Sequence, residues 1–421
     1  MRTIVVNERE HERVPFLRGI LTRSLLGAGL AFEDAFKIAS TVRDELADTP
    51  EITAEELRQR VSRLLQDEGD EEALEQYCLP PVAPSRILVN SLNDTVSAFS
   101  RGRHARYLQS SGMQAEKAEQ TTALIYDQLI VAGISSITSG ELSYLTYLCL
   151  QQEAGKKAAK SYLVWSEFDR SSRPLALLIC GTVGTGKSTI ATQIAHLLEI
   201  TRIQSTDMLR EVMRMMVPKR LLPVLHTSSF NAWKYLPIQD EHDRDRDQLI
   251  AEGYRSQVEL LAVPCEAVLQ RAVEECVSII LEGVHVHPDL LTRAPGESDV
   301  ITVHVTLAVL SSKDLKSRLR GRGVEVPQRR AEKYLNHFGS IWSLQSFLLS
   351  EADRCDVPII TNEDKDKSVF QIIQQVNGEL ARHFTGTAEQ IFGSVVSDVR
   401  KRAETSSWRE IVPLLRDLSR S

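Results

Sequence analysis

In the second half of the chain, short continuous apolar runs alternate with longer stretches that have the periodicity of a helix. The runs lie at 175–180, 277–281, 300–307 and 357–360. A strand buried on both faces of a parallel sheet has such a continuous apolar sequence, whereas helices repeat their apolar positions every three or four residues. This alternation predicts an α/β fold with a doubly wound parallel sheet.

The first 150 residues instead contain an internal repeat. Residues 4–7 correspond to 87–90, and Phe16 corresponds to Phe99, all at one constant offset. Each unit has the pattern of a short strand, a turn and two or three helices, which indicates duplication of one small, mainly helical module. Prolines between the units are typical of a linker. We therefore predict domains at 1–79, 84–155 and 172–385, and a helical C-terminal extension at 386–421.

Composition and charge exclude several classes of protein. The chain has 421 residues, of which 42% are hydrophobic and 25% are charged. These values are ordinary for globular proteins and argue against extensive disorder. A formal net charge of −7 argues against a general nucleic-acid coat. We see no apolar stretch long enough to span a bilayer and no signal peptide, so we expect a cytoplasmic protein with no membrane partner. The sequence leaves homo-oligomer formation open.

The strongest motif follows the first apolar run and fits G-x-x-x-x-G-K-[ST] at every defined position: Gly181-Thr182-Val183-Gly184-Thr185-Gly186-Lys187-Ser188. A helical pattern continues from Thr189, which is the context that a phosphate-binding loop requires. Glycine lets backbone N–H groups curl around phosphate oxygens, a lysine neutralises the phosphates, and a hydroxyl ligates Mg²⁺. We predict ATP binding by Gly181–Thr189, with Lys187 also catalytic. The alternative is a degenerate loop.

A second polar group follows the next predicted strand. Asp207 opens a helix in which Arg210 and Arg214 lie one turn apart on a shared face. We expect both arginines to bind an anionic substrate. Asp207 is the candidate catalytic base or hydroxyl-orienting residue and also contributes to substrate binding. In the alternative, Asp207 only caps the helix and the arginines are solvated.

The third candidate is an acid at the end of an apolar strand. Glu282 ends the run that begins at Val277, and burial of a carboxylate is costly without a partner. We expect Ser188 and Glu282 to serve a Mg²⁺ ion that accompanies ATP. His285 and His287 follow without a third ligand nearby, which favours loop or substrate-side residues over a metal site.

A basic cluster lies further along the chain: Arg318, Arg320, Arg322, Arg329, Arg330 and Lys333. Positive charge that closes over a transferring phosphate is typical of a kinase lid, and we predict that Arg318 and Arg322 are catalytic in such a lid. A nucleic-acid patch is the alternative. Apart from Tyr334, the cluster lacks the interleaved aromatic residues that stack on bases.

Two resemblances connect these motifs to known families. Val14-Pro15-Phe16 and 24–30 resemble the ATP-cone, a nucleotide-sensing module, and the second repeat departs from it at 97–99 and 110–112. The kinase half resembles archaeal-type 2-phosphoglycerate kinase in its phosphate loop, in 205–214, in 228–233 and in 281–285. The resemblance implies a P-loop kinase fold preceded by an ATP-cone that could bind a regulatory nucleotide. It also implies ATP-dependent phosphorylation of the 3-hydroxyl of 2-phosphoglycerate, a small phosphorylated acid.

Three other functions stay open at this stage. The first is a kinase of another phosphorylated small molecule, such as an inositol phosphate, which the resemblance to relatives outside the archaea leaves open. A regulator that binds ATP without transferring phosphate would need a DNA-reading element, and the sequence has no evident one. A nucleic-acid 5′-hydroxyl kinase would need a basic channel for its strand.

Overall fold

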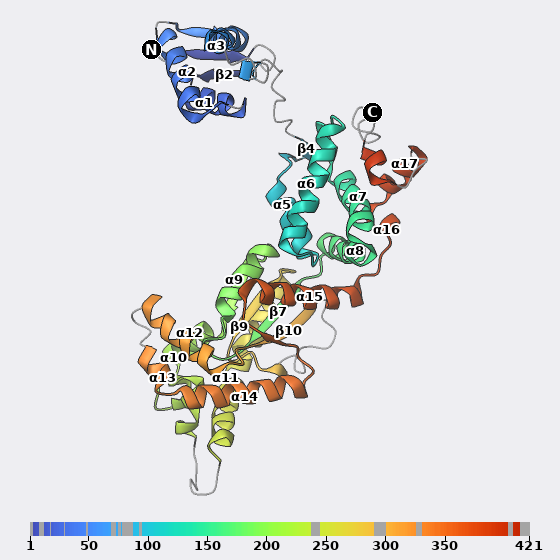
Figure 1. Cartoon of the computed structure of the whole chain (residues 1–421). Coiled ribbons are helices and arrows are strands. Elements are labelled where there is room, and N and C mark those ends of the chain that lie inside the picture. Colours follow the sequence, from blue (N-terminus) through green and yellow to red (C-terminus); the bar gives the residue numbers. More distant parts are fainter. Residues whose placement is uncertain are drawn as a thin grey trace. The chain divides into compact units, whose positions relative to one another are not determined.

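The computed structural model describes residues 3–7, 12–16, 18–28, 30–47, 49–68, 73–74, 77, 87–91, 95–236, 245–289, 300–325, 331–402 and 407–412. The chain divides into two compact units, Met1–Arg86 and Ile87–Ser421 (Figure 1). The second unit contains almost all of the three segments that were predicted after the first domain. The boundaries within it stay a prediction.

The first unit is a small three-stranded sheet with helices. The strand order is β2-β1-β3, in which β1 pairs antiparallel with β2 and parallel with β3. The elements are β1 (Ile4–Asn7), β2 (Glu12–Pro15), α1 (Arg18–Gly27), α2 (Phe32–Glu45), β3 (Glu51–Thr53) and α3 (Ala54–Glu68). Leu25, Val42 and Leu65 are fully buried in its core. The sequence predicted only the first strand, because β2 and β3 are short and lack the apolar run of β1.

The second repeat has the same topology within the second unit. Its strand order is β5-β4-β6, again with one antiparallel and one parallel pairing around the central strand. The elements are β4 (Leu88–Asn90), β5 (Val96–Ala98), α5 (Arg101–Ser110), α6 (Ala115–Val131), β6 (Ser136–Thr138), α7 (Ser139–Cys149), a π-helical turn (Leu150–Ala154) and α8 (Lys156–Arg170). The repeat in the sequence therefore corresponds to two sheets of one design.

The C-terminal segment packs on this second repeat. Its helices include α16 (Ala388–Phe392) and α17 (Ser394–Arg402), which are separated at Gly393, where φ is 57°. Phe392 and the fully buried Trp408 share one hydrophobic core with Leu108 and Ile125 of the repeat. The tail and the second repeat are thus held together by one core.

The kinase half is a parallel five-stranded sheet in the order β11-β10-β7-β9-β8. The strands are β7 (Leu175–Cys180), β8 (Arg202–Ser205), β9 (Ile279–Gly283), β10 (Ile301–Ala308) and β11 (Ile359–Thr361). The helical elements are α9 (Lys187–Leu197), α10 (Thr206–Met216), α11 (Arg246–Glu274), α12 (Ser312–Glu325), α13 (Ala331–Leu335), α14 (Phe338–Arg354), α15 (Lys365–His383) and two 3₁₀ turns (Pro223–His226 and Ser229–Tyr235). The predicted α/β parallel fold is confirmed.

Helices cover both faces of this sheet. Alternate residues of β7 face opposite ways: Leu177 and Ile179 join a core with α9 and α15, and Leu178 joins one with α11 and α14. This arrangement explains why β7 is apolar at every position. Because the strands are parallel, the loops that follow them meet at one edge of the sheet. Among the described residues, no helix combines the length and apolarity that a membrane crossing requires.

Candidate active site

The phosphate loop connects the end of β7 to the start of α9. Gly181, Gly184 and Gly186 have φ values of 146°, 89° and 90°, which side-chain-bearing residues rarely adopt. A Cβ at Gly186 would lie 2.5 Å from Nδ2 of Asn362, and that amide donates to the Thr185 carbonyl over 2.7 Å. The loop therefore needs glycine at this position, and the residue after β11 fixes its shape.

Two charged or polar side chains leave the start of α9. Lys187 Nζ donates to the Thr182 carbonyl over 2.9 Å, which holds the ammonium group over the loop. Ser188 Oγ donates to Oε1 of Glu282 over 2.9 Å, and Glu282 is only 5% exposed. Adjacent hydroxyl and carboxylate oxygens form the kind of donor set that Mg²⁺ prefers, so these residues fit the predicted metal role.

The start of α10 lies directly beside the end of β9. Ser205 pairs with Glu282 in the sheet, and a Cβ at Gly283 would lie 1.8 Å from the Thr206 hydroxyl. The Ser205 side chain accepts from the backbone N–H of Asp207 over 3.3 Å and so caps the helix. The alternative that Asp207 is merely the helix cap is therefore wrong. Its own carboxylate is largely exposed, in the first turn of α10.

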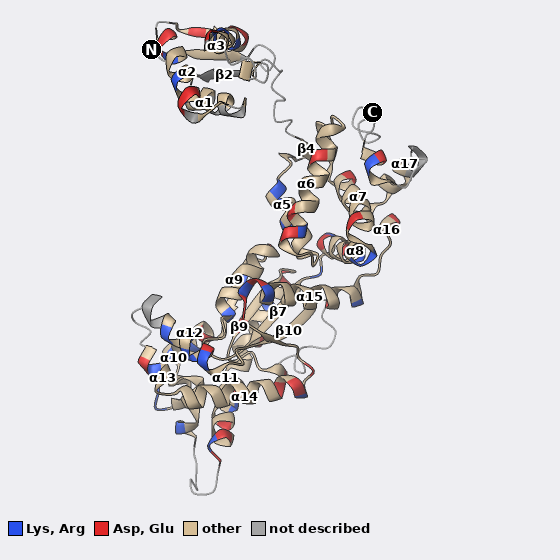
Figure 2. Cartoon of the chain, in the orientation of Figure 1, with Lys and Arg blue, Asp and Glu red and all other residues tan. Residues whose placement is uncertain are grey.

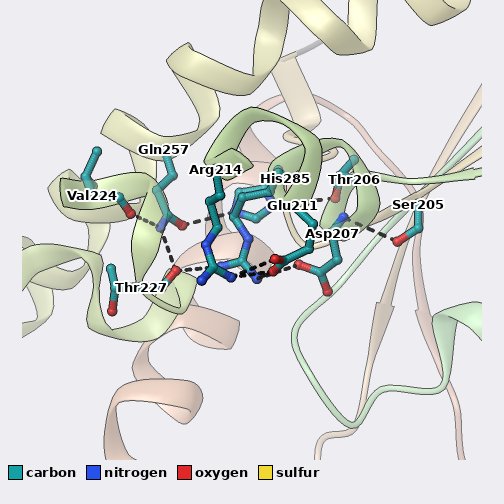
Figure 3. A network of polar contacts seen from close by, with 10 residues as sticks. Ser205, Thr206, Asp207, Glu211, Arg214, Val224, Thr227, Gln257 and His285 are labelled. Atoms are coloured by element: carbon teal, nitrogen blue, oxygen red, sulfur yellow. Dashed lines mark hydrogen bonds and ion pairs between the residues drawn. The ribbon is translucent and has the colours of Figure 1, made fainter. Parts of the chain in front are cut away.

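The two arginines of α10 contact different groups, and Figure 3 labels Arg214 beside Glu211. Arg210 is 14% exposed in its side chain, donates to the Thr227 carbonyl over 2.5 Å and lies 3.3 Å from Asp207. Arg214 forms an ion pair with Glu211 at 2.6 Å. The Nε atoms of both arginines are buried without a hydrogen-bond partner among the described residues. Each guanidinium group thus keeps a donor that the described residues do not satisfy.

His285 is buried next to the start of α10, where its Nδ1 lies 3.4 Å from the Thr206 hydroxyl. Burial lowers the pKa of this fully enclosed imidazole to about 3. The charge of Asp207 acts in the opposite direction, while the charges of Arg210 and Lys187 lower the pKa further. In the structure, Arg210 lies 3.3 Å from Asp207, and Ser205, two residues before Asp207, pairs with Glu282, which accepts from Ser188. The catalytic and substrate-binding roles of these residues stay predictions.

Part of the basic cluster lies beside the loop. Leu315 and Leu319 of α12 would contact a Cβ at Gly184 at 2.9 and 3.0 Å, and Arg318 donates to the Asn362 carbonyl. Arg318 is therefore anchored next to the phosphate loop. The side chain of Arg322 and residues 326–330, which include two further arginines of the cluster, lie outside the described residues. The catalytic role of the lid stays a prediction.

The sequence patterns did not identify Gln257, which contacts His285, or Thr227, whose carbonyl contacts Arg210. Gln257 is completely buried in α11, between Tyr254 and Val258. An amide at an otherwise apolar helix position was the available signal, since buried amides need partners. Thr227 contributes only its backbone carbonyl, so its residue type carried no signal.

Comparisons with curated sequences give clear matches to one family. No family model matches the chain. The 2-phosphoglycerate kinase of Pyrococcus horikoshii is 34% identical over 291 residues, which cover 69% of this chain and 93% of that protein. The protein of the same name from Methanopyrus kandleri is 33% identical, covering 68% of this chain and 85% of that protein.

Solved structures give weaker matches. A shikimate kinase from Acinetobacter baumannii has a TM-score of 0.28 at 13% identity, and covers 52% of this chain and 99% of its own. A gluconokinase from Sinorhizobium meliloti has a TM-score of 0.25 at 17% identity, with 52% of this chain and 97% of that chain covered. Scores this low support no conclusion, whereas the curated sequences do. On those sequences, the chain belongs to the 2-phosphoglycerate kinase family.

Proposed function

We propose that this kinase transfers the γ-phosphoryl group of ATP to the 3-hydroxyl of 2-phosphoglycerate, giving ADP and 2,3-bisphosphoglycerate. The family relationship supports the substrate. The observation that carries the proposal is the connection between the phosphate loop and the start of α10: Ser188 donates to Glu282, which pairs with Ser205 in the sheet. Lys187 directly precedes Ser188, and Arg210 lies 3.3 Å from Asp207. Phosphoryl transfer requires positioning and charge compensation more than covalent chemistry, and these residues supply both.

The phosphate loop binds ATP in this proposal. The backbone N–H groups of 181–189 contact the phosphates, and the ammonium group of Lys187 compensates their charge. Ser188 and Glu282 would hold Mg²⁺, which when bound neutralises the negative charge of the phosphates. Arg318 donates to the carbonyl of Asn362, whose side chain contacts the loop, so the charge of Arg318 adds to that of Lys187.

The acceptor binds at α10. 2-Phosphoglycerate carries a phosphate, a carboxylate and one free hydroxyl. Arg210 and Arg214, each with a buried unsatisfied donor, bind the two anionic groups. Asp207 accepts the hydroxyl proton as the oxygen bonds to the γ-phosphorus, and the bond between that phosphorus and the bridging oxygen of ADP breaks.

One comparison of acceptors tests the proposal. ATP consumption is measured with 2-phosphoglycerate, with an inositol phosphate and with a 5′-hydroxyl oligonucleotide at equal concentrations. We expect turnover with the first only. Turnover with an inositol phosphate instead would show that 2-phosphoglycerate is not the substrate. Preference for the oligonucleotide would contradict the proposed acceptor site. A nucleic-acid kinase would need a basic channel, whereas Figure 2 shows acidic residues interspersed with basic ones over the described parts of the second unit.

The first unit adds a regulatory element to the proposal. We infer that it binds a nucleotide, on the basis of its sequence resemblance to an ATP-cone. In the Lys187→Ala variant, ATP binding that persists in equilibrium dialysis would report this separate site. Its absence would limit nucleotide binding to the phosphate loop.

A further inference from the structure

A buried chain of hydrogen bonds joins the Thr206 hydroxyl, at the start of α10, to the backbone carbonyl of Thr227 (Figure 3). Gln257 is 0% exposed, and its Nε2 donates to the carbonyls of Val224 over 2.5 Å and Thr227 over 3.1 Å. Its Oε1 lies 3.0 Å from His285 Nε2. On its other side, His285 Nδ1 lies 3.4 Å from the Thr206 hydroxyl.

Hydrogen-bond donors and acceptors fix the direction of this chain. The amide nitrogen of Gln257 uses its two N–H groups on two carbonyls, so Oε1 is left to accept. His285 must then carry its proton on Nε2, and its Nδ1 accepts from the hydroxyl of Thr206. Burial keeps His285 neutral, which is the form that this pattern requires.

The two ends of the chain are the groups that handle the acceptor. The Thr227 carbonyl accepts from Gln257 and also from Arg210, so it orients the guanidinium group. At the other end, Thr206 is the first residue of α10 and is followed by Asp207. Gln257 and His285 therefore connect Arg210, which binds the anion in the proposed function, to Asp207, which faces the substrate hydroxyl.

We propose that Gln257 and His285 are positioning residues of the acceptor site. Gln257 orients Arg210 through the Thr227 carbonyl. His285 holds the start of α10, and with it Asp207, in line with Arg210. This inference rests on the proposed function of Asp207 and Arg210. Both positioning residues are buried and cannot contact the substrate, so they act through the side chains of Arg210 and Asp207. They serve the acceptor and leave ATP binding to the phosphate loop.

Two histidine variants separate the two halves of the chain. His285→Asn keeps an oxygen near the position of Nδ1 for Thr206 but loses the bond to Gln257. We expect it to raise the KM for 2-phosphoglycerate at least 10-fold. His285→Gln keeps a donor near Nε2 for Gln257 but loses the bond to Thr206, and we expect it chiefly to lower kcat. The KM for ATP should change less than 2-fold in both variants.

A double-mutant cycle tests whether Gln257 acts through Arg210. Gln257→Met alone should raise the KM for the acceptor at least 10-fold. In the Arg210→Ala background the same change should add less than 2-fold, because the group it positions is gone. His304→Asn is the matched control, since His304 is also buried but takes no part in this chain of hydrogen bonds. Thermal unfolding of every variant reports any general loss of stability.

The outcomes distinguish the inference from the function beneath it. Additive effects of Gln257→Met and Arg210→Ala in an active enzyme would contradict the inference alone. Kinetic changes equal to those of His304→Asn would also overturn it, because they would reflect fold stability only. If the wild type transfers no phosphate to 2-phosphoglycerate, the proposed function fails and the inference fails with it.

Discussion

Asp207 lies in the first turn of α10 with an exposed carboxylate, and the cap of that helix is Ser205. Asp207→Asn preserves the shape of the side chain but removes its ability to accept a proton. We predict that kcat falls about 10²–10⁴-fold while the affinity for ATP changes little. Steady-state kinetics with each substrate varied in turn checks this. Loss of ATP affinity with kcat intact would place Asp207 at the metal.

The two arginines of α10 make a second prediction at this scale. Arg210→Ala and Arg214→Ala should each raise the KM for 2-phosphoglycerate, because a charged hydrogen bond to the anion is lost. We expect each variant to lose about 2–4 kcal/mol of transition-state stabilisation, measured as the change in kcat/KM. The lysine variants should rescue only in part, since an ammonium group cannot form the bidentate fork. Kinetics at saturating ATP measures the effect. Unchanged parameters in both alanine variants would place the anion elsewhere.

At the scale of elements, the sequence predicted the parts with strong patterns. β7 is buried on both faces and apolar throughout, so its bounds followed directly. The strands β2, β3, β5 and β6 were missed because they are short and have no apolar run like Ile4–Val6 of β1. The phosphate loop and Asp207 were identified from side-chain chemistry. Gln257 was not, because its role depends on which carbonyls the tertiary fold places around it.

The phosphate loop supplies the prediction for an element. Gly186→Ala should reduce ATP affinity at least about 10-fold, because a positive φ and the close amide of Asn362 both exclude a Cβ. Gly378→Ala is the matched control: nothing lies within 4 Å of its Cβ position inside α15. The control should be stabilising by up to about 1 kcal/mol. Normal ATP binding by Gly186→Ala, measured by calorimetry, would contradict this account of the loop.

At the scale of the molecule, the second repeat is docked on the kinase core. Ser110 Oγ donates to the Leu197 carbonyl over 2.9 Å, at the end of the helix that begins at Lys187. Asn377 of α15 donates to the Ser110 carbonyl over 2.8 Å. The sequence could not reveal this contact, because it joins polar groups that lie far apart along the chain. The repeat, the tail and the sheet therefore form one compact unit.

Three histidines with lowered pKa values predict how stability depends on pH. Burial lowers the pKa of His104 to about 4 and those of His285 and His304 to about 3. The unfolded chain therefore takes up protons below about pH 6.5 that the folded chain does not, so stability is lost as the pH falls from there. Each imidazole contributes about 1.4 kcal/mol per pH unit. Urea unfolding between pH 7 and 5 should show a shallower loss in His304→Leu, and equal slopes would contradict this.

The identity of the phosphorylated product tests the central claim most directly. Purified protein is incubated with ATP, Mg²⁺ and 2-phosphoglycerate, and the products are identified by ³¹P NMR, with Lys187→Ala as the matched control. We predict equal amounts of ADP and 2,3-bisphosphoglycerate from the wild type, and a rate at least about 100-fold lower from the variant, because the phosphates lose their charge compensation. ADP with inorganic phosphate alone, or a variant that retains a tenth of the rate, would contradict the account.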